Sequence, residues 1–231
     1  MIGIKTVTMK AVALLLVSLL AANNAFGQEH TFQIGGSVGG NVGLSHDRFN
    51  MTDVNRQLQV GGSAAAIALC SMSPRVNLTG QLGGLVERFG TTRNTESAYL
   101  DYDWKYSWAE ATGVVSYLPV VNEKFDVFTG IGFTTRRLLK ATLNGEAIAS
   151  NGNRADFSDF SVYSQTNTWN YLLPVQAGLN FHLASGNSIH TVAEVQVGFR
   201  DRWNYPGSGN EMLPNEKLLG VSLKAAYLFK I

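Results

Sequence analysis

The feature that most constrains the fold of this chain is a two-residue alternation of apolar and polar side chains. The clearest example runs from Trp169 to His182, where most odd positions are large and apolar and most even positions are polar or glycine. Successive side chains of a β-strand point to opposite faces, whereas an amphipathic helix repeats about every 3.6 residues. The alternation therefore predicts strands with one apolar and one polar face.

The same alternation, taken along the whole chain, predicts eight strands. They cover residues 31–44, 57–70, 75–89, 106–120, 125–139, 168–183, 189–201 and 217–231. The second is rich in alanine and glycine, so its sequence does not show which positions share a face. Short connections at 71–74, 121–124 and 184–188 alternate with long ones at 45–56, 90–105, 140–167 and 201–216. An even number of long strands joined in this way is typical of outer-membrane barrels.

An open sheet could not lie in hydrocarbon, because the backbone groups of its edges would stay unpaired. The predicted fold is therefore all-β, an eight-stranded antiparallel up-and-down transmembrane β-barrel. A soluble ligand-binding barrel of the lipocalin type is the alternative, with the apolar side chains lining the inside. Aromatic residues at strand ends, such as Phe125, Trp169 and Phe181, favour the membrane interpretation, because such residues gather at membrane interfaces.

The first residues have the layout of a secretory signal peptide. Lys5 and Lys10 precede a mostly apolar run at 11–22, and Ala25 and Gly27 are small residues at the positions that a signal peptidase reads. The run is shorter than the roughly 18 residues of a spanning helix, although an uncleaved anchor remains the alternative. We predict a signal peptide at 1–27 and a mature barrel at 28–231.

Charge and cysteine content narrow the function classes. The chain has 18 basic and 17 acidic residues, and removing the leader takes away two lysines and no acids. A nearly neutral mature chain argues against nucleic acid as a partner. Cys70 is the only cysteine, so the chain has no internal disulfide and no thiolate metal cluster.

Three segments carry a family resemblance. The glycine-rich first strand, residues 127–133 and residues 173–181 resemble the outer-membrane β-barrel domain family common in Bacteroidota. The last five residues, 227–231, are similar to the C-terminal signal that the barrel assembly machinery recognises, although Ile231 replaces the usual phenylalanine. The resemblance implies a small eight-stranded outer-membrane protein, in contact with outer-membrane lipid and lipopolysaccharide and with that machinery during biogenesis. It implies no particular activity.

Two groups of residues are candidate functional features. Glu110, Arg136, Glu194 and Lys224 occupy polar positions and are expected to form a charge network in the lumen, because buried charges must be paired. If the last two strands pair symmetrically about the connection at 201–216, the numbers of two opposed residues add up to about 418. Glu194 and Lys224 would then face each other. We interpret this network as a structural plug rather than a transport site.

The second group lies in a long connection. From Ala98 to Trp108 the even positions are mostly aromatic, and Tyr102 and Trp104 with Asp101 and Asp103 form a candidate surface for an extracellular ligand. This strand-like pattern is expected to run outward past the lipid, and Tyr106 and Trp108 are expected in an interface girdle and in packing between the protruding strands. Below Trp108 the apolar side chains move from even to odd positions, which predicts a β-bulge near Trp108.

The sequence gives little sign of catalysis, and it predicts no cofactor and no metal. His46 lies in an external loop, between Ser45 and Asp47, but adjacent loop residues do not make a placed triad. Ser188 and His190 are expected at the periplasmic end, away from lipid A. A structural or surface-interaction barrel is the leading function. A narrow channel and an enzyme that modifies lipid A or phospholipid are the alternatives.

Overall fold

The computed structural model describes residues 31–46, 54–56, 59–94, 98–199 and 217–231. Its strands are β1 (Phe32–His46), β2 (Val54–Arg56), β3 (Gln59–Ser73), β4 (Val76–Asn94), β5 (Ala98–Val121), β6 (Phe125–Ala149), β7 (Arg154–Ser161), β8 (Trp169–His182), β9 (Ser188–Gly198) and β10 (Lys217–Lys230). One turn of 3-10 helix, η1 (Tyr163–Gln165), follows β7. The expected leader at 1–27 and the connection at 201–216 lie outside the described residues, so the leader stays a prediction.

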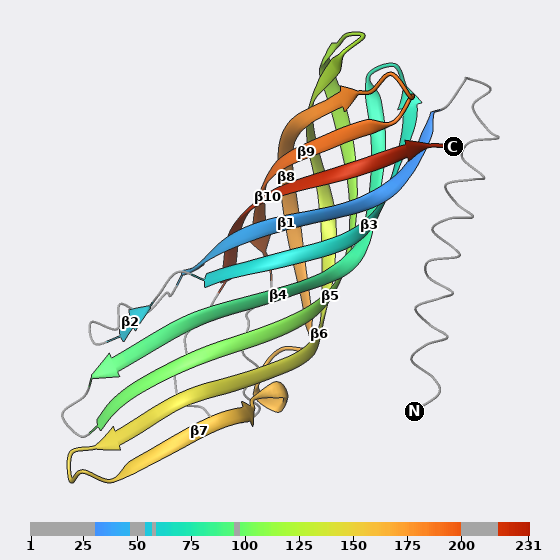
Figure 1. Cartoon of the computed structure of the whole chain (residues 1–231). Helices are drawn as coiled ribbons and strands as arrows, with labels where there is room; N and C mark the ends of the chain where they lie inside the picture. Colours follow the sequence, from blue (N-terminus) through green and yellow to red (C-terminus); the bar gives the residue numbers. More distant parts are fainter. Residues whose placement is uncertain (1–30, 47–53, 57–58, 95–97, 200–216) are drawn as a thin grey trace.

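Eight of the strands close into a ring by antiparallel pairing. The order around the ring is β1, β3, β4, β5, β6, β8, β9 and β10, and β10 pairs back onto β1 (Figure 1). Sequential strands are therefore neighbours, as in an up-and-down barrel. The predicted fold class is confirmed. The connections after β3, β5 and β8 are short and lie together with the start of β1 and the end of β10 at one end, here called the short-turn end.

The two faces of the wall have opposite character. On β8, Val175 points outward with 45% of its surface exposed, whereas Gln176 points inward and is only 2% exposed. The outward face carries apolar side chains on every strand of the ring, and the inward face carries many buried polar ones, among them Gln33, Thr79, Gln81, Thr134, Asn170 and Gln196. A soluble ligand-binding barrel would have the reverse arrangement. In β3, Ile67 and Leu69 point inward and Val60 outward, which settles the phase that its sequence left open.

Outward-facing aromatic side chains lie at two levels of the ring, on part of its circumference. Phe125 and Phe181 contact each other near the short-turn end, with ring centroids 6.4 Å apart. Towards the other end, Phe133 stacks on Tyr171, and the Arg137 guanidinium lies 5.7 Å from the ring centroid of Trp169. Two aromatic levels on either side of an apolar band are typical of barrels that cross a bilayer.

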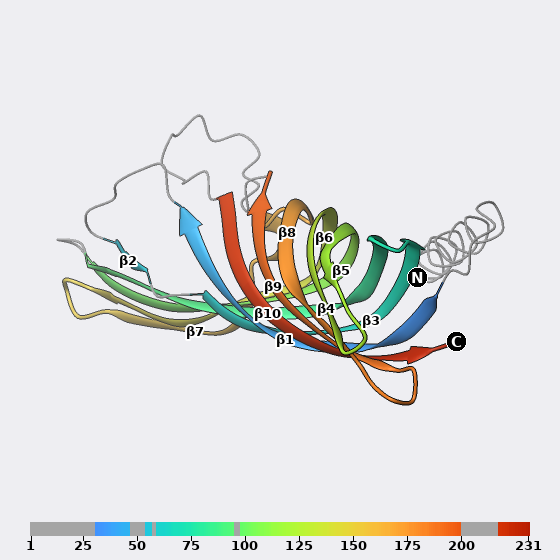
Figure 2. The ribbon, with the colours of Figure 1, turned by 90° about the horizontal axis from the view of Figure 1, so that it is seen from above.

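The predicted loops at 90–105 and 140–167 are wrong for most of their length. β4, β5 and β6 continue beyond the ring, and β7 pairs with the outer part of β6. We call this extension the blade and define it as residues 89–94, 98–107, 140–149 and 154–161. Figures 1 and 2 show the blade extending away from the barrel, past the end of β1 and the start of β10. Cross-strand pairing and packed aromatic rings supply the stability that a polar loop lacks.

A β-bulge marks the base of the blade. Ser107 pairs with Lys140 but Trp108 pairs with Leu138, so Leu139 is one extra residue in β6. The bulge lies where it was predicted, but in the neighbouring strand. The predicted change of phase in β5 is wrong, because the even positions of β5 point inward both above and below Trp108. The prediction failed because it placed the large rings of β5 on the outward face. They point inward, and the small residues Ala109 and Ala111 point outward.

Among the described residues, no helix combines the length and the apolar character needed to cross a membrane.

Candidate functional site

The lumen contains a connected network of charged side chains. Glu110 and Arg136 are direct neighbours on β5 and β6, with Arg136 Nε 2.7 Å from Glu110 Oε2. Lys224 Nζ on β10 lies 2.8 Å from Glu194 Oε1 on β9 and 4.0 Å from Glu110 Oε1. The structure therefore brings together all four residues singled out from the sequence. The register of β9 and β10 differs from the predicted one by two residues, since Glu194 lies opposite Ser222 and reaches Lys224 diagonally.

Two further residues belong to this network. Arg136 Nη1 lies 3.6 Å from Glu87 Oε1, and Trp108 Nε1 donates a 3.0 Å hydrogen bond to the other oxygen of Glu87. Gln196 accepts a hydrogen bond from Arg136 Nη2 and donates one of 2.6 Å to Glu194 Oε1. Both residues occupy polar positions of the two-residue alternation. The alternation places both residues in the lumen, but it places many other polar residues there too, so it could not single out these two.

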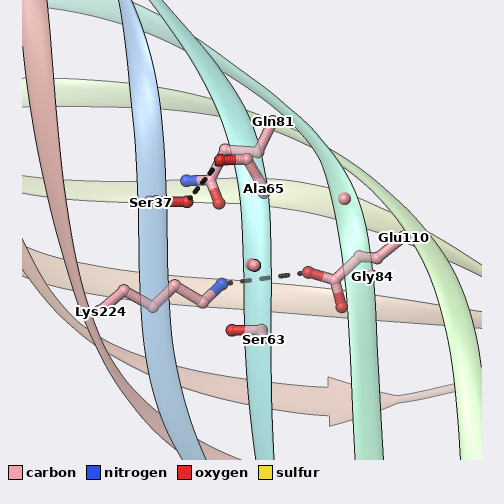
Figure 3. A pocket seen from close by; sticks show the side chains of 9 residues that line it. Ser37, Ser63, Ala65, Gln81, Gly84, Glu110 and Lys224 are labelled. Carbon is pink, nitrogen blue, oxygen red and sulfur yellow. Dashed lines mark hydrogen bonds and ion pairs between the residues drawn. The ribbon is translucent and has the colours of Figure 1, made fainter.

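The network has more negative than positive charge. Within the described part of the lumen it holds three carboxylates, on Glu87, Glu110 and Glu194, and two cationic groups, on Arg136 and Lys224. Figure 3 shows Lys224 and Glu110 reaching towards each other past the small residues of β3 and β4. The cavity beside them measures about 10 Å³, which is room for about one water molecule.

An aromatic cluster lies above the charged network, where the ring meets the blade. Tyr106 and Trp108 point inward and are almost fully buried, so they pack between strands as predicted, but they do not belong to an interface girdle. The segment after β7 also turns inward: Val162 is buried in the cluster, and its N–H donates to the Ala141 carbonyl at 3.1 Å. The other buried members are Leu85, Phe89, Leu138, Ala141 and Leu143.

The aromatic cluster continues outward along one face of the blade. Phe89 stacks on both Tyr106 and Trp104, with centroid distances of 5.8 and 5.9 Å. Tyr102 contacts the edge of Phe157 at 5.8 Å. We call the whole series of rings the aromatic ladder; it consists of Trp108, Tyr106, Phe89, Trp104, Tyr102, Phe157 and Phe160.

The outer rings of the ladder remain accessible to solvent. Tyr102 and Trp104 are half-buried, and Phe160 at the far end is exposed. Burial raises the pKa of the Tyr102 hydroxyl. Asp101 and Asp103 alternate with these rings along β5 and therefore lie on the opposite face of the blade. The predicted surface thus divides into an aromatic face and a polar face.

The residues considered for catalysis do not form a site in the described structure. The side chain of His46 lies outside the described residues. Ser188 Oγ donates to Gln33 Oε1 at 3.0 Å, and the His190 ring stacks on Phe128 at 4.5 Å. Ser188 and His190 therefore do not make a nucleophile–base pair. Within the described ranges, no group of three or more His, Cys, Asp or Glu side chains is placed to hold a metal ion.

The chain resembles known proteins in structure but not in sequence. No family model matches the sequence, and no curated protein matches it. Among solved structures, the chain is similar to Ail, the attachment invasion locus protein of Yersinia pestis, in complex with the heparin analogue sucrose octasulfate. That match has 14% identity and a TM-score of 0.38, over 86% of this chain and 99% of Ail.

Two other outer-membrane β-barrel proteins are similar to the chain to the same degree. Neisserial surface protein A shares 11% identity with a TM-score of 0.44, over 87% of this chain and all of that protein. The outer membrane protein AlkL, determined in lipid bilayers, shares 13% identity with a TM-score of 0.44, over 88% of this chain and 92% of AlkL. The pairing of its own strands shows that the chain folds as an antiparallel up-and-down β-barrel, and these structures resemble it.

Proposed function

We propose that this chain is an integral protein of the bacterial outer membrane whose closed barrel holds a rigid blade for contact with a partner outside the cell. The mature protein begins at Gln28 in this proposal. Its immediate surroundings are outer-membrane lipid and lipopolysaccharide, and the barrel assembly machinery inserts it. Its role is structural or interactive, and nucleic acid is not a partner.

The wall of the barrel supports the membrane location. The outward face exposes apolar side chains, with exposed fractions between 45% and 67% for Val38, Val115, Ile131, Val175 and Leu223. In water this apolar surface would be a strong aggregation hazard, because soluble monomers rarely expose large contiguous apolar patches. In a bilayer the same side chains contact lipid, and the polar inward positions avoid it.

The contents of the lumen support a closed barrel. An interior of eight strands is narrow enough for side chains to fill. Here the charged network crosses it at mid-height, and the aromatic cluster covers the network on the side of the blade. A hydrated ion would have to displace both layers. We therefore favour a plug over the narrow channel that the sequence left open.

The aromatic ladder is the observation that carries the surface role. Its inner rings are anchored in the buried cluster and its outer rings are accessible, so the face is held rigid before any partner arrives. Rigid aromatic rings provide large contact area at a low cost in conformational entropy. A flexible polar loop would have to become ordered on binding. The blade is already ordered, because β4 pairs with β5, β5 with β6, and β6 with β7.

A glycan array tests this role, with the folded mature protein labelled and applied in detergent micelles. We expect binding to a subset of glycans that is lost in the double variant Tyr102→Ala with Trp104→Ala. Tyr99→Ala is the matched control, because Tyr99 is an exposed ring of the same strand on the opposite face. Folding of each variant is checked by the faster gel mobility of the unboiled protein. Absence of glycan binding, or equal loss in the control, would argue against the aromatic face as the contact surface.

A further inference from the structure

The barrel contains a chamber at its short-turn end, separate from both the charged network and the blade. The chamber has a volume of about 510 Å³ and lies inside the ring, with walls contributed by β1, β3, β4, β5, β6, β8 and β10. Pockets that bind small molecules commonly measure about 300–1,000 Å³. In the membrane orientation proposed above, the chamber faces the periplasm.

One wall of the chamber is a row of buried polar side chains. Asp126 and Asn180 are cross-strand neighbours on β6 and β8, and neither is more than 6% exposed. Asp126 Oδ2 is paired with His182 Nε2 at 2.9 Å. Asp126 Oδ1 and Asn180 Oδ1 are buried and have no hydrogen-bond partner among the described residues, and both side chains line the chamber.

Two adjacent acceptors without donors are unusual in a folded protein. A buried polar group that stays unpaired is destabilising, so nearly all such groups have a partner. A ligand of these groups would have to supply hydrogen-bond donors to one oxygen on each of two neighbouring residues, and one of these oxygens belongs to a carboxylate. A primary ammonium group has three donors and one positive charge, which suits this pair of acceptors.

The opposite wall has the opposite charge. Lys230, near the end of β10, lines the chamber and is exposed at its rim, beside Gly186 of the turn between β8 and β9. β10 is three places further round the ring than β6, so Lys230 faces the chamber from another side than Asp126. A ligand that extends from Asp126 to the rim would meet a carboxylate-binding group there.

We propose that the chamber is a binding site for a small zwitterion with a primary ammonium group and a carboxylate. The ammonium group donates to Asp126 Oδ1 and Asn180 Oδ1, and the carboxylate faces Lys230. Short peptides with free ends have this chemistry. The site is independent of the blade, and binding in it requires no passage through the charged network.

Calorimetric titration of the folded mature protein in micelles tests the proposal, with alanine, dialanine and trialanine as probes. We expect saturable binding of at least one of the three. Acetylation of its amino end removes the charge that Asp126 recognises, and amidation of its carboxyl end removes the one that Lys230 recognises. Each change should weaken binding about tenfold or more, since a site built on hydrogen bonds rejects ligands that leave its groups unpaired.

The variants follow the same logic. Asp126→Asn keeps the shape of the side chain and removes its charge, so it should weaken binding of the free peptide to a similar extent. Glu123→Gln is the matched control, because Glu123 is an exposed carboxylate of the turn next to Asp126. Lys230→Gln changes an exposed rim residue and gives a second measurement if Asp126→Asn does not fold.

Two results would overturn the proposal. One is the absence of saturable binding for all three peptides, which would mean that water alone fills the chamber. The other is equal affinity for free and acetylated peptides, which would mean that the two acceptors do not read an ammonium group. Neither result depends on the glycan experiment, since that experiment tests the other end of the molecule.

Discussion

Arg136 Nε lies 2.7 Å from Glu110 Oε2, and the same guanidinium also reaches Glu87 on β4 and Gln196 on β9. One side chain of β6 therefore binds side chains from three other strands across the lumen. Its planar group with several donors suits this role, which a lysine could not reproduce. Arg136 is the centre of the charged network: its removal would take away the cation beside Glu87 and leave Glu110 with Lys224 at 4.0 Å.

The first prediction follows from this position. Arg136→Met should lower the free energy of unfolding by about 3–5 kcal/mol, because breaking a buried ion pair leaves an uncompensated buried charge. Urea unfolding in detergent, followed by gel mobility, measures the change. Arg154→Met is the control: its ion pairs with Glu146 and Asp156 lie on the exposed blade and should contribute nothing measurable. Equal free energies of unfolding for the two variants would mean that the charged network does not stabilise the barrel.

The second prediction concerns the two faces of the wall. Val175→Arg should impair assembly or stability by about 2–4 kcal/mol, the cost of arginine on the lipid-facing side near the bilayer midplane. Gln176→Arg should be tolerated better, because Gln176 lies opposite Glu194, whose Oε2 has no partner among the described residues. The yield of heat-modifiable protein in membranes gives the comparison. The reverse order of damage would mean that the outward face does not contact lipid.

The third prediction concerns ion flow. Purified protein in planar bilayers should give little or no steady conductance, since the charged network and the aromatic cluster both occupy the lumen. Single-channel recording measures this directly, with a porin of known conductance as the positive control. A stable open channel of porin size would show that the plug does not exist in the membrane.

The fourth prediction concerns export. The mature protein should start at Gln28, because Ala25 and Gly27 satisfy the cleavage rule. N-terminal sequencing of the protein from purified outer membranes checks the position. Recovery of Met1 in that fraction would support the uncleaved anchor instead.

Strands with one consistent apolar face were the part of the fold that the sequence predicted well. β8 is the best case, because a single slip in its register would turn Val175 inward and Gln176 outward. β3 could not be assigned in this way, since alanine and glycine differ little in their preference for lipid or lumen. Its faces follow only from its pairing with β1 and β4.

The blade was missed for a different reason. Outside the membrane neither face of a sheet must be apolar, so residues 140–149 and 154–161 carry no strict alternation. Their strand structure depends on partners distant in sequence, such as Tyr102 and Phe157, which meet across Gly145 of β6. The ring of charges was predictable as a set of positions. The contact of Lys224 with Glu194 was also predicted, but as a directly opposed pair; its diagonal geometry depends on a register two residues from the predicted one.

The single extra residue at Leu139 has a consequence for the outside of the molecule. Below it, the odd positions of β6 form the outer surface, and these include Ile131 and Phe133. Above it the parity is reversed, and Lys140 is exposed while Ala141 packs inside. An insertion of one residue thus sets the height at which the outer surface of this strand stops suiting lipid and begins to suit water. Without this extra residue a regular alternation would turn Lys140 inward and Ala141 outward, so Leu139 keeps the charged side chain of Lys140 on the outside of the strand.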